Sequence, residues 1–249
     1  MHTHHSPIVE EDRGPSRPLV NRLLSSLPED EQSQLLQLGE VVRVGLGEVL
    51  YEPGHSITHV YFPADSLISL LAVAEGRMTL EVGAVGREGM IGASIVLGRE
   101  MAQVRAVVQR AGRVLRIEAA AFCAACARMA ALQRLLQRYT DTLLAQAIQI
   151  AVCSRFHVLE ARLARSLLIT RDRLQSDKFH LTHEFLAHAL GVRRVGVTKA
   201  ASALQQQKLI SYSRGNIEIL DAAGLEAASC RCYELVRDEG ALGIANVFI

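Results

Sequence analysis

The distribution of glycine and proline constrains this fold more than any other feature of the sequence. All six prolines lie within residues 1–63, and eleven of the eighteen glycines lie between Gly39 and Gly112. Between Arg113 and Leu190 the chain contains neither residue. Because glycine and proline mark turns and interrupt helices, the chain should be rich in turns first and helical afterwards. The sequence therefore predicts an α+β protein with a β-rich N-terminal part and a mostly helical C-terminal part.

We expect four consecutive regions from this pattern. Residues 1–18 form a disordered tail, and residues 19–128 form a β-barrel or jelly-roll domain that begins with a helix from Asn21 to Leu38. Residues 129–156 form one long helix, and residues 157–249 form a second domain. Short apolar runs between Gly-rich turns predict the strands of the barrel. These runs are Val41–Val44, Glu48–Tyr51, His59–Phe62, Leu67–Leu71, Met78–Val82, Val104–Val108 and Val114–Ile117.

The long helix carries apolar residues at the spacing of a coiled-coil seam. A helix that covers only its own barrel needs one apolar face. A second apolar surface is added here by Leu135, Leu144, Ala147 and Ile148. We therefore predict a dimerisation helix that packs on its own domain and on a second copy of the chain. The alternative is an amphipathic helix that lies only on its own barrel. The predicted dimer residues are Leu132, Leu136, Tyr139, Leu143 and Ile150.

Residues 182–204 have the pattern of two short helices joined by a sharp turn. Thr182 can cap the first helix, since its hydroxyl can accept a hydrogen bond from an unpaired backbone N–H. Gly191 in Leu190-Gly191-Val192 suits the turn, because glycine tolerates positive φ. In the second helix Val197, Ala201 and Leu204 share one apolar face. This pattern predicts a helix-turn-helix.

Local charge points to a nucleic-acid partner, although the net charge is only +1. Residues 185–217 contain no Asp or Glu but five Lys or Arg residues, which favours contact with phosphate. The two β runs around Arg214-Gly215-Asn216 predict a hairpin, or wing, whose tip reaches phosphate. The alternative is a solvated basic face on an ordinary helical pair. The predicted DNA-binding residues are Thr182, Arg193, Arg194, Val195, Thr198, Lys199, Ser202, Arg214 and Asn216.

The order of barrel, long helix and winged helix-turn-helix resembles the Crp/Fnr superfamily of bacterial transcriptional regulators, over about residues 35–220. The resemblance is strongest in residues 182–210, and it extends to Gly47-Glu48 and Pro53-Gly54 in the barrel. It implies a cyclic-nucleotide-binding-like barrel that relays an effector signal through the dimer helix. It also implies that Arg194 and Lys199 read bases in the major groove. The family has an acidic residue where this chain has Val195, so we expect a half-site different from the family's best-known operator.

The same resemblance places the effector pocket at Gly92, Ala93, Ser94, Arg99 and Arg105. The family's phosphate-binding segment uses a Glu for the ribose and an Arg for the cyclic phosphate. Ala93 replaces that Glu, and Glu100 stands where the Arg belongs, so its carboxylate would repel a phosphate. Ala147 and Ile148 align with the positions that hydrogen-bond adenine. We therefore do not expect cyclic AMP bound in the usual mode. The alternatives are another effector, for instance of the nucleotide type, no ligand at all, or a barrel that serves as a platform for protein contacts and dimerisation. The sequence does not give an effector's identity.

The remaining candidate residues are interpreted as structural. Cys123 and Cys126 could serve a metal or redox site, but two cysteines supply half of a four-ligand site, so small buried thiols are favoured. Cys230 and Cys232 are interpreted in the same way, and the histidines of the tail as solvent-exposed. His183 and His188 are expected to touch phosphate or solvent. No metal site and no certain cofactor is predicted.

These features together predict a cytoplasmic regulator. No known catalytic motif occurs in the sequence, so an enzyme is not predicted. No apolar run is longer than Ala119–Ala127, and no membrane partner is expected. The predicted partners are double-stranded DNA, a second copy of the chain and RNA polymerase. The alternative function is a second-messenger sensor, for instance of a cyclic dinucleotide, that acts through protein contacts with a vestigial helix-turn-helix.

Overall fold

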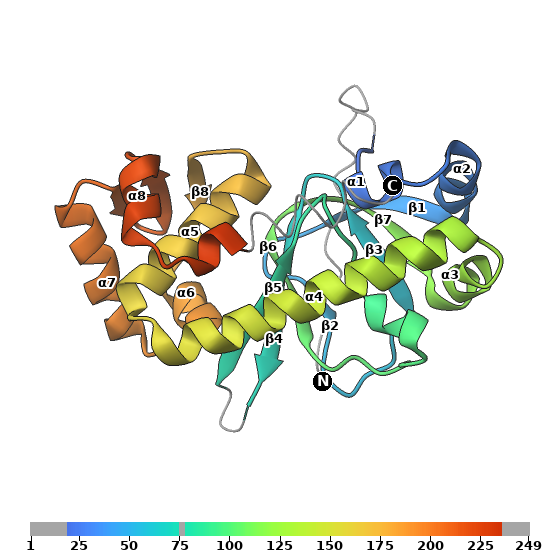
Figure 1. Cartoon of the computed structure of the whole chain (residues 1–249), viewed down its shortest axis with the longest axis horizontal. Coiled ribbons are helices and arrows are strands. Elements are labelled where there is room, and N and C mark those ends of the chain that lie inside the picture. The colour runs from blue at the N-terminus through green and yellow to red at the C-terminus, as the bar shows by residue number, and fades with distance from the viewer. Residues whose placement is uncertain (1–18, 75–77, 236–249) are drawn as a thin grey trace, which may run out of the picture.

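The computed structural model describes residues 19–74 and 78–235. The predicted tail at residues 1–18 lies outside the described residues. An antiparallel barrel-like domain comes first, followed by a long helix and a small α+β domain, so the predicted fold class is confirmed (Figure 1). One sheet of the first domain has the order β1-β7-β3 and the other the order β2-β6-β4-β5. The strands are β1 (Gly39–Val44), β2 (Val49–Tyr51), β3 (His59–Pro63), β4 (Leu67–Val73), β5 (Thr79–Val85), β6 (Arg105–Arg110) and β7 (Gly112–Glu118).

The strands lie where alternating or continuous apolar runs predicted them. The two sheets enclose a core in which Phe62 of β3 meets Phe122 of α3 (Ala119–Cys126) edge to face, with ring centroids 5.8 Å apart. A 3₁₀ helix, η2 (Ala93–Leu97), lies between β5 and β6.

The predicted helix from Asn21 to Leu38 is wrong in one respect, because the structure has two helices there. α1 (Arg22–Ser25) and α2 (Glu29–Leu38) are separated by Pro28, whose extended ψ of 145° precedes α2. The Asn21 side chain accepts a hydrogen bond from the Leu24 amide and donates to the carbonyl oxygens of Pro63 and Gly89. It therefore caps α1 and fastens that helix to the barrel.

The long helix α4 (Ala130–Phe156) runs from the barrel to the C-terminal domain (Figure 1). Its buried side chains include three of the five predicted dimer residues and also Leu135 of the predicted second surface. Leu132, Leu136 and Tyr139 are buried in the core of their own barrel, and the Tyr139 hydroxyl donates to the Met90 carbonyl. Those three residues are therefore unavailable to a partner, and their assignment as dimer contacts is wrong.

The exposed apolar stripe of α4 consists of Leu144, Ile148 and Val152, which are 60%, 57% and 42% exposed. Two of these belong to the second apolar surface that the sequence predicted. Leu143 and Ile150 are half-buried. Among the described residues no single helix is long and apolar enough to cross a membrane, and only α3 with α4, bent by 110°, pass by length and composition as a pair.

The C-terminal domain packs four helices and three strands of the described residues around a separate core. Its three-stranded sheet has the order β8-β10-β9, and β8 was not predicted. The core contains Leu163, Leu186, Val197, Leu204 and Ile217, which come from α5, α6, α7 and β10. The elements are α5 (Leu159–Leu174), β8 (Lys178–His180), α6 (His183–Leu190), α7 (Arg194–Gln206), β9 (Ile210–Ser213), β10 (Asn216–Ile219) and α8 (Ala222–Ala228).

Candidate nucleic-acid interface

Helices α6 and α7 form the predicted helix-turn-helix. The Thr182 hydroxyl accepts a hydrogen bond from the Phe185 amide at 3.1 Å, which confirms the predicted cap. Gly191 has φ = 65°, in the left-handed region that glycine adopts without strain. The Val192 amide then donates to the Ala187 carbonyl at 3.0 Å and closes the end of α6. The turn is therefore fixed by local chemistry that the sequence already contains.

Helix α7 separates a buried face from an exposed one. Val197, Ala201 and Leu204 are buried as predicted, and Ala200 joins them. The residues predicted to contact DNA lie on the other side or at the N-terminal end of the helix. All six are exposed: Arg193, Arg194, Val195, Thr198, Lys199 and Ser202. They form one surface whose geometry suits insertion into a major groove, which admits an α-helix.

His183 organises this surface, which the sequence did not predict. Its Nδ1 lies 3.0 Å from the Thr198 hydroxyl, and its ring stacks on Tyr212 of β9 with centroids 4.1 Å apart. Burial, and then the positive charge of Arg194, lowers the pKa of His183. The neutral ring therefore joins α6, α7 and the wing. The prediction that His183 touches phosphate or solvent did not include this role, and the residue is partly exposed.

The wing is the predicted hairpin of β9 and β10. Arg214 and Gly215 both have positive φ, 51° and 85°, as a two-residue turn of the type I′ class requires. A Cβ at Gly215 would lie 2.5 Å from Cε1 of His180, so the close approach also requires glycine. Arg214 is exposed at the tip, and the Asn216 side chain is paired with Nδ1 of His180 at 3.1 Å.

Thr182 is exposed but its hydroxyl already serves as the α6 cap, and Asn216 is already hydrogen-bonded. The polar groups of this surface that are most available to a ligand are the side-chain cations. Arg193, Arg194, Lys199, Lys208 and Arg214 are all exposed, and among the described residues none forms an ion pair. Five unneutralised cations without a nearby acid in the chain segment create a positive potential over this face.

His188 is exposed to solvent, as the sequence predicted, and its backbone also contacts the barrel. The hydroxyl of Thr79 at the start of β5 donates to the His188 carbonyl at 2.9 Å. Arg173 of α5 forms an ion pair with Glu88 of the barrel at 3.0 Å, and the two side chains are largely buried. The first helix of the helix-turn-helix, α6, therefore packs on β5. Helix α5 is held to the barrel by the ion pair between Arg173 and Glu88.

The five residues predicted to form an effector pocket do not line a described cavity. Gly92, Ala93, Ser94 and Arg99 lie in or next to η2, and Arg105 comes from β6. Ala93 is buried in the barrel core, and the Tyr51 side chain fills the space above Gly92. Arg105 is paired with Glu52 at 2.9 Å, so its charge is already partly satisfied.

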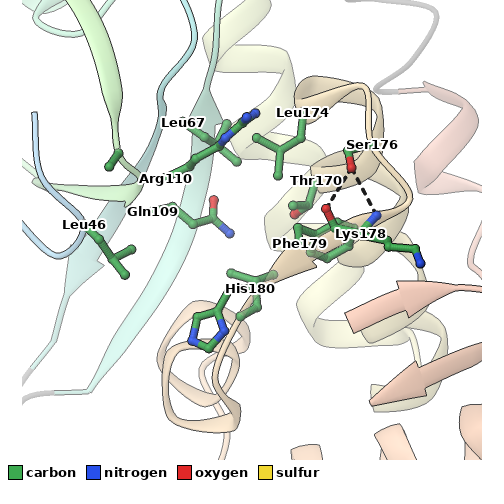
Figure 2. A pocket seen from close by; sticks show the side chains of 12 residues that line it. Leu46, Leu67, Gln109, Arg110, Thr170, Leu174, Ser176, Lys178, Phe179 and His180 are labelled. Carbon is green, nitrogen blue, oxygen red and sulfur yellow. Dashed lines mark hydrogen bonds between the residues drawn. The ribbon is translucent and has the colours of Figure 1, made fainter. Parts of the chain in front are cut away.

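A cavity of about 320 Å³ lies instead between the barrel and the C-terminal domain (Figure 2). Leu67, Gln109 and Arg110 line it from the barrel, and Thr170 and His180 from the other side. Because it lies between two domains, a molecule bound there would touch both of them.

Comparison with known proteins agrees with this architecture. Residues 161–228 match the family model of the Crp-like helix-turn-helix domain. A transcriptional regulator of the Crp/Fnr family from Eubacterium rectale is 17% identical, with a TM-score of 0.67 over 83% of this chain and 96% of that chain. FixK2 from Bradyrhizobium japonicum is 15% identical, with a TM-score of 0.68 over 77% of this chain and 98% of that chain.

A third similar structure is that of CLP from Xanthomonas campestris, described as a c-di-GMP-responsive global regulator. It is 14% identical, with a TM-score of 0.64 over 77% of this chain and 99% of that chain. Identities this low establish a shared fold. No curated protein sequence matches this chain.

The fold and the exposed face of α7 define a class of proteins that join a sensor-type barrel to a winged helix-turn-helix. The match of residues 161–228 places the C-terminal domain in the Crp-like group of that class. Residues 161–228 are similar to the Crp-like helix-turn-helix domain, and the fold of the whole chain is that of solved structures of Crp/Fnr-family regulators.

Proposed function

We propose that this protein is a homodimeric regulator that binds a twofold-symmetric operator through α7. The observation that carries the proposal is the exposed face of α7, on which Arg194 and Lys199 have no ion-pair partner among the described residues. Arginine and lysine donate to guanine O6 and N7 in the major groove. Arg193 and Arg214 flank that face and serve as phosphate contacts, which position the protein without reading sequence.

Specificity depends on Val195, which is exposed beside the two base-reading cations. A valine side chain has no hydrogen-bonding group, so it cannot accept from cytosine N4, but it can pack on a thymine methyl. Ser202 and Thr198 lie further along the same face. The Thr198 hydroxyl is held by His183 and the Arg194 carbonyl, so Thr198 contributes mainly by keeping α7 in place.

The dimer supports this mode of binding. Leu144, Ile148 and Val152 lie four residues apart on α4 and form an apolar stripe that their own chain leaves uncovered. The same stripe on a second α4 is complementary, since a coiled-coil seam pairs equivalent residues. Two copies joined in this way present two α7 helices, which fit half-sites about 34 Å apart.

Regulation would act through the contact between β5 and α6. Thr79 reaches the carbonyl of His188 next to the Gly191 turn, so an effector or partner that moves β5 also moves the helix-turn-helix. Ala93 and the paired Arg105 argue against cyclic AMP in the usual mode. Of the other proposed effector residues, Gly92 is the N-cap of η2, Ser94 lies within η2, and Arg99 is exposed after its end. The proposal includes RNA polymerase as a further partner. It also places the protein in the cytoplasm, where a bacterial regulator of transcription acts.

Selection from random duplex DNA, followed by gel shifts of the recovered sequence at moderate salt, tests the proposal. The wild-type chain should retain a symmetric site, and the double variant Arg194→Ala/Lys199→Ala should lose it. The matched control is Arg128→Ala/Arg134→Ala, which removes two exposed cations from the distant end of the barrel domain and α4. Failure to retain any sequence, or equal loss in both double variants, would refute specific binding through α7. The first of these results would favour a sensor that acts through protein contacts.

A further inference from the structure

Three cysteines and a histidine from two distant chain segments meet at one point. Cys153 lies in the last turn of α4, His157 ends that helix, and Cys230 and Cys232 follow α8. Their four ligand atoms all lie within 4.8 Å of one another. The Cys153 and Cys230 sulfurs are 3.5 Å apart, and the Cys232 sulfur is 3.4 Å from His157 Nδ1. The three cysteines are buried and the histidine is half-buried.

These separations fit the edges of one small coordination sphere. With Zn–S bonds of about 2.3 Å and Zn–N bonds of about 2.0 Å, the edges of a tetrahedron are roughly 3.5–3.8 Å long. Three Cys and one His are also one of the ligand sets of structural zinc. An iron–sulfur cluster is a poorer match, because its protein ligands are divided among two or four irons and ligand atoms on different irons stand further apart.

The buried charges around the four residues also favour a metal site. Arg162 and Arg165 are only 9% and 7% exposed, and neither pairs with a carboxylate of the described residues. Arg162 donates to the Leu190 carbonyl, but Nε of Arg165 is buried without a hydrogen-bond partner. Glu81 lies near Arg165 without forming an ion pair with it, and burial raises the pKa of its carboxyl group more than Arg173 and Arg165 lower it. Buried cations without a counter-charge are costly.

A bound divalent ion would provide the missing negative charge, because its thiolate ligands carry more charge than the ion itself. Binding of Zn²⁺ releases one proton from each of the three thiols, so three thiolates, one neutral imidazole and the ion carry a net charge of −1. The fields of both Arg162 and Arg165 reach Cys153 and Cys230. A net negative centre there is therefore stabilised by the two buried guanidinium groups. Gln149 of α4 also donates to the Cys232 sulfur at 2.8 Å, as an outer hydrogen-bond donor to a thiolate would.

We propose that Cys153, His157, Cys230 and Cys232 form a zinc site that clamps the hinge between α4 and the DNA-binding domain. His157 is the residue at which α4 ends before α5 begins. An ion held there ties the last turn of α4 to the segment after α8. The site thus fixes the position of the C-terminal domain relative to α4. Cys123 and Cys126 lie outside it, and no third ligand accompanies them among the described residues.

The test uses the full chain with His2, His4 and His5 replaced by alanine, which removes the histidines of the N-terminal tail as an alternative metal site. Metal analysis of protein purified under reducing conditions should find about one zinc per chain. Cys230→Ser should lower zinc affinity at least about tenfold, whereas the matched control Cys123→Ser should not change it. Replacement of zinc by Co²⁺ should give thiolate-to-cobalt charge-transfer absorption and the visible bands of tetrahedral cobalt.

A second variant guards against simple misfolding of the serine variant. His157→Cys should keep the zinc and add thiolate-to-cobalt absorption, because four thiolates also bind zinc, whereas His157→Ala should weaken binding. Zinc-free protein that takes up no cobalt would overturn the proposal, as would equal zinc retention in Cys230→Ser and Cys123→Ser. A disulfide between Cys153 and Cys230 with no metal, found by mass spectrometry, would also overturn it. Gel shifts on the same samples report DNA binding separately.

Discussion

Removal of the Tyr139 hydroxyl tests whether this face of α4 packs on its own barrel or on a second chain. This group accepts a hydrogen bond from the Met90 amide at 3.0 Å and donates one to the Met90 carbonyl at 2.9 Å. Both residues are buried, and the pKa of Tyr139 is raised by burial, so the hydroxyl stays protonated. The substitution Tyr139→Phe keeps the ring and removes only this oxygen. It leaves an amide N–H and a carbonyl without partners in the barrel core.

The expected loss follows from those two groups. An unsatisfied buried polar group costs about 1–3 kcal/mol, so the two groups left by Tyr139→Phe should cost roughly 2–6 kcal/mol of stability. At about 2–4 °C per kcal/mol for a chain of this size, the Tm should fall by roughly 4–24 °C. Circular dichroism during thermal and urea unfolding measures it; the chain has no tryptophan to serve as a fluorescent probe.

The control is Ile148→Glu, in the exposed stripe of the same helix. A charge there should dissociate the proposed dimer in sedimentation experiments and leave the barrel's stability nearly unchanged, because the side chain is largely exposed. Our reasoning about α4 fails if the roles are reversed, with Tyr139→Phe splitting the dimer at full barrel stability. That result would mean that Tyr139 is part of the dimer contact, as the sequence predicted.

Three more predictions concern the helix-turn-helix. Val195→Glu should shift the preferred base at one operator position toward the pair whose cytosine N4 can donate to the new carboxylate, by about 1–3 kcal/mol of discrimination in a binding selection; an unchanged preference would contradict the placement of Val195 in the groove. Gly191→Ala should destabilise the C-terminal domain by about 1–2 kcal/mol in urea unfolding, because the turn needs positive φ, whereas the exposed Ser202→Ala should be nearly neutral. His183 has a pKa below its ordinary value of 6.5 in the folded chain, so the unfolded chain binds its proton more readily. Its contribution to stability should thus be complete above that value and be lost as pH falls through it toward the folded pKa; a stability profile that His183→Gln leaves unchanged in this range would rule out this role.

Local signals in the sequence were sufficient for the strands of the barrel and for the winged helix-turn-helix apart from β8. Alternating apolar residues, a threonine cap and one glycine at positive φ are properties of short segments, and each predicted its element correctly. The α4 seam failed for a different reason. A 3.5-residue period shows that a helix has an apolar stripe but not what covers it, and Leu132, Leu136 and Tyr139 are covered by their own barrel.

Interactions between distant segments could not be predicted from one sequence. His183 meets Thr198 and Tyr212 only because α6, α7 and β9 pack together. Cys153 and Cys230 are 77 positions apart, and no local spacing announces that they meet. The strand β8 was missed because its three residues, Lys178–His180, are too short for a period-two pattern.

The separation of the two faces of α7 has a consequence for how such a regulator diversifies. The core-facing residues Val197, Ala201 and Leu204 hold the helix, while Arg194, Val195 and Lys199 contact nothing in the core. Substitutions at exposed positions usually change stability by less than about 0.5 kcal/mol. Operator preference can therefore drift through single substitutions without any loss of folding, so that copies of the same scaffold come to govern different promoters.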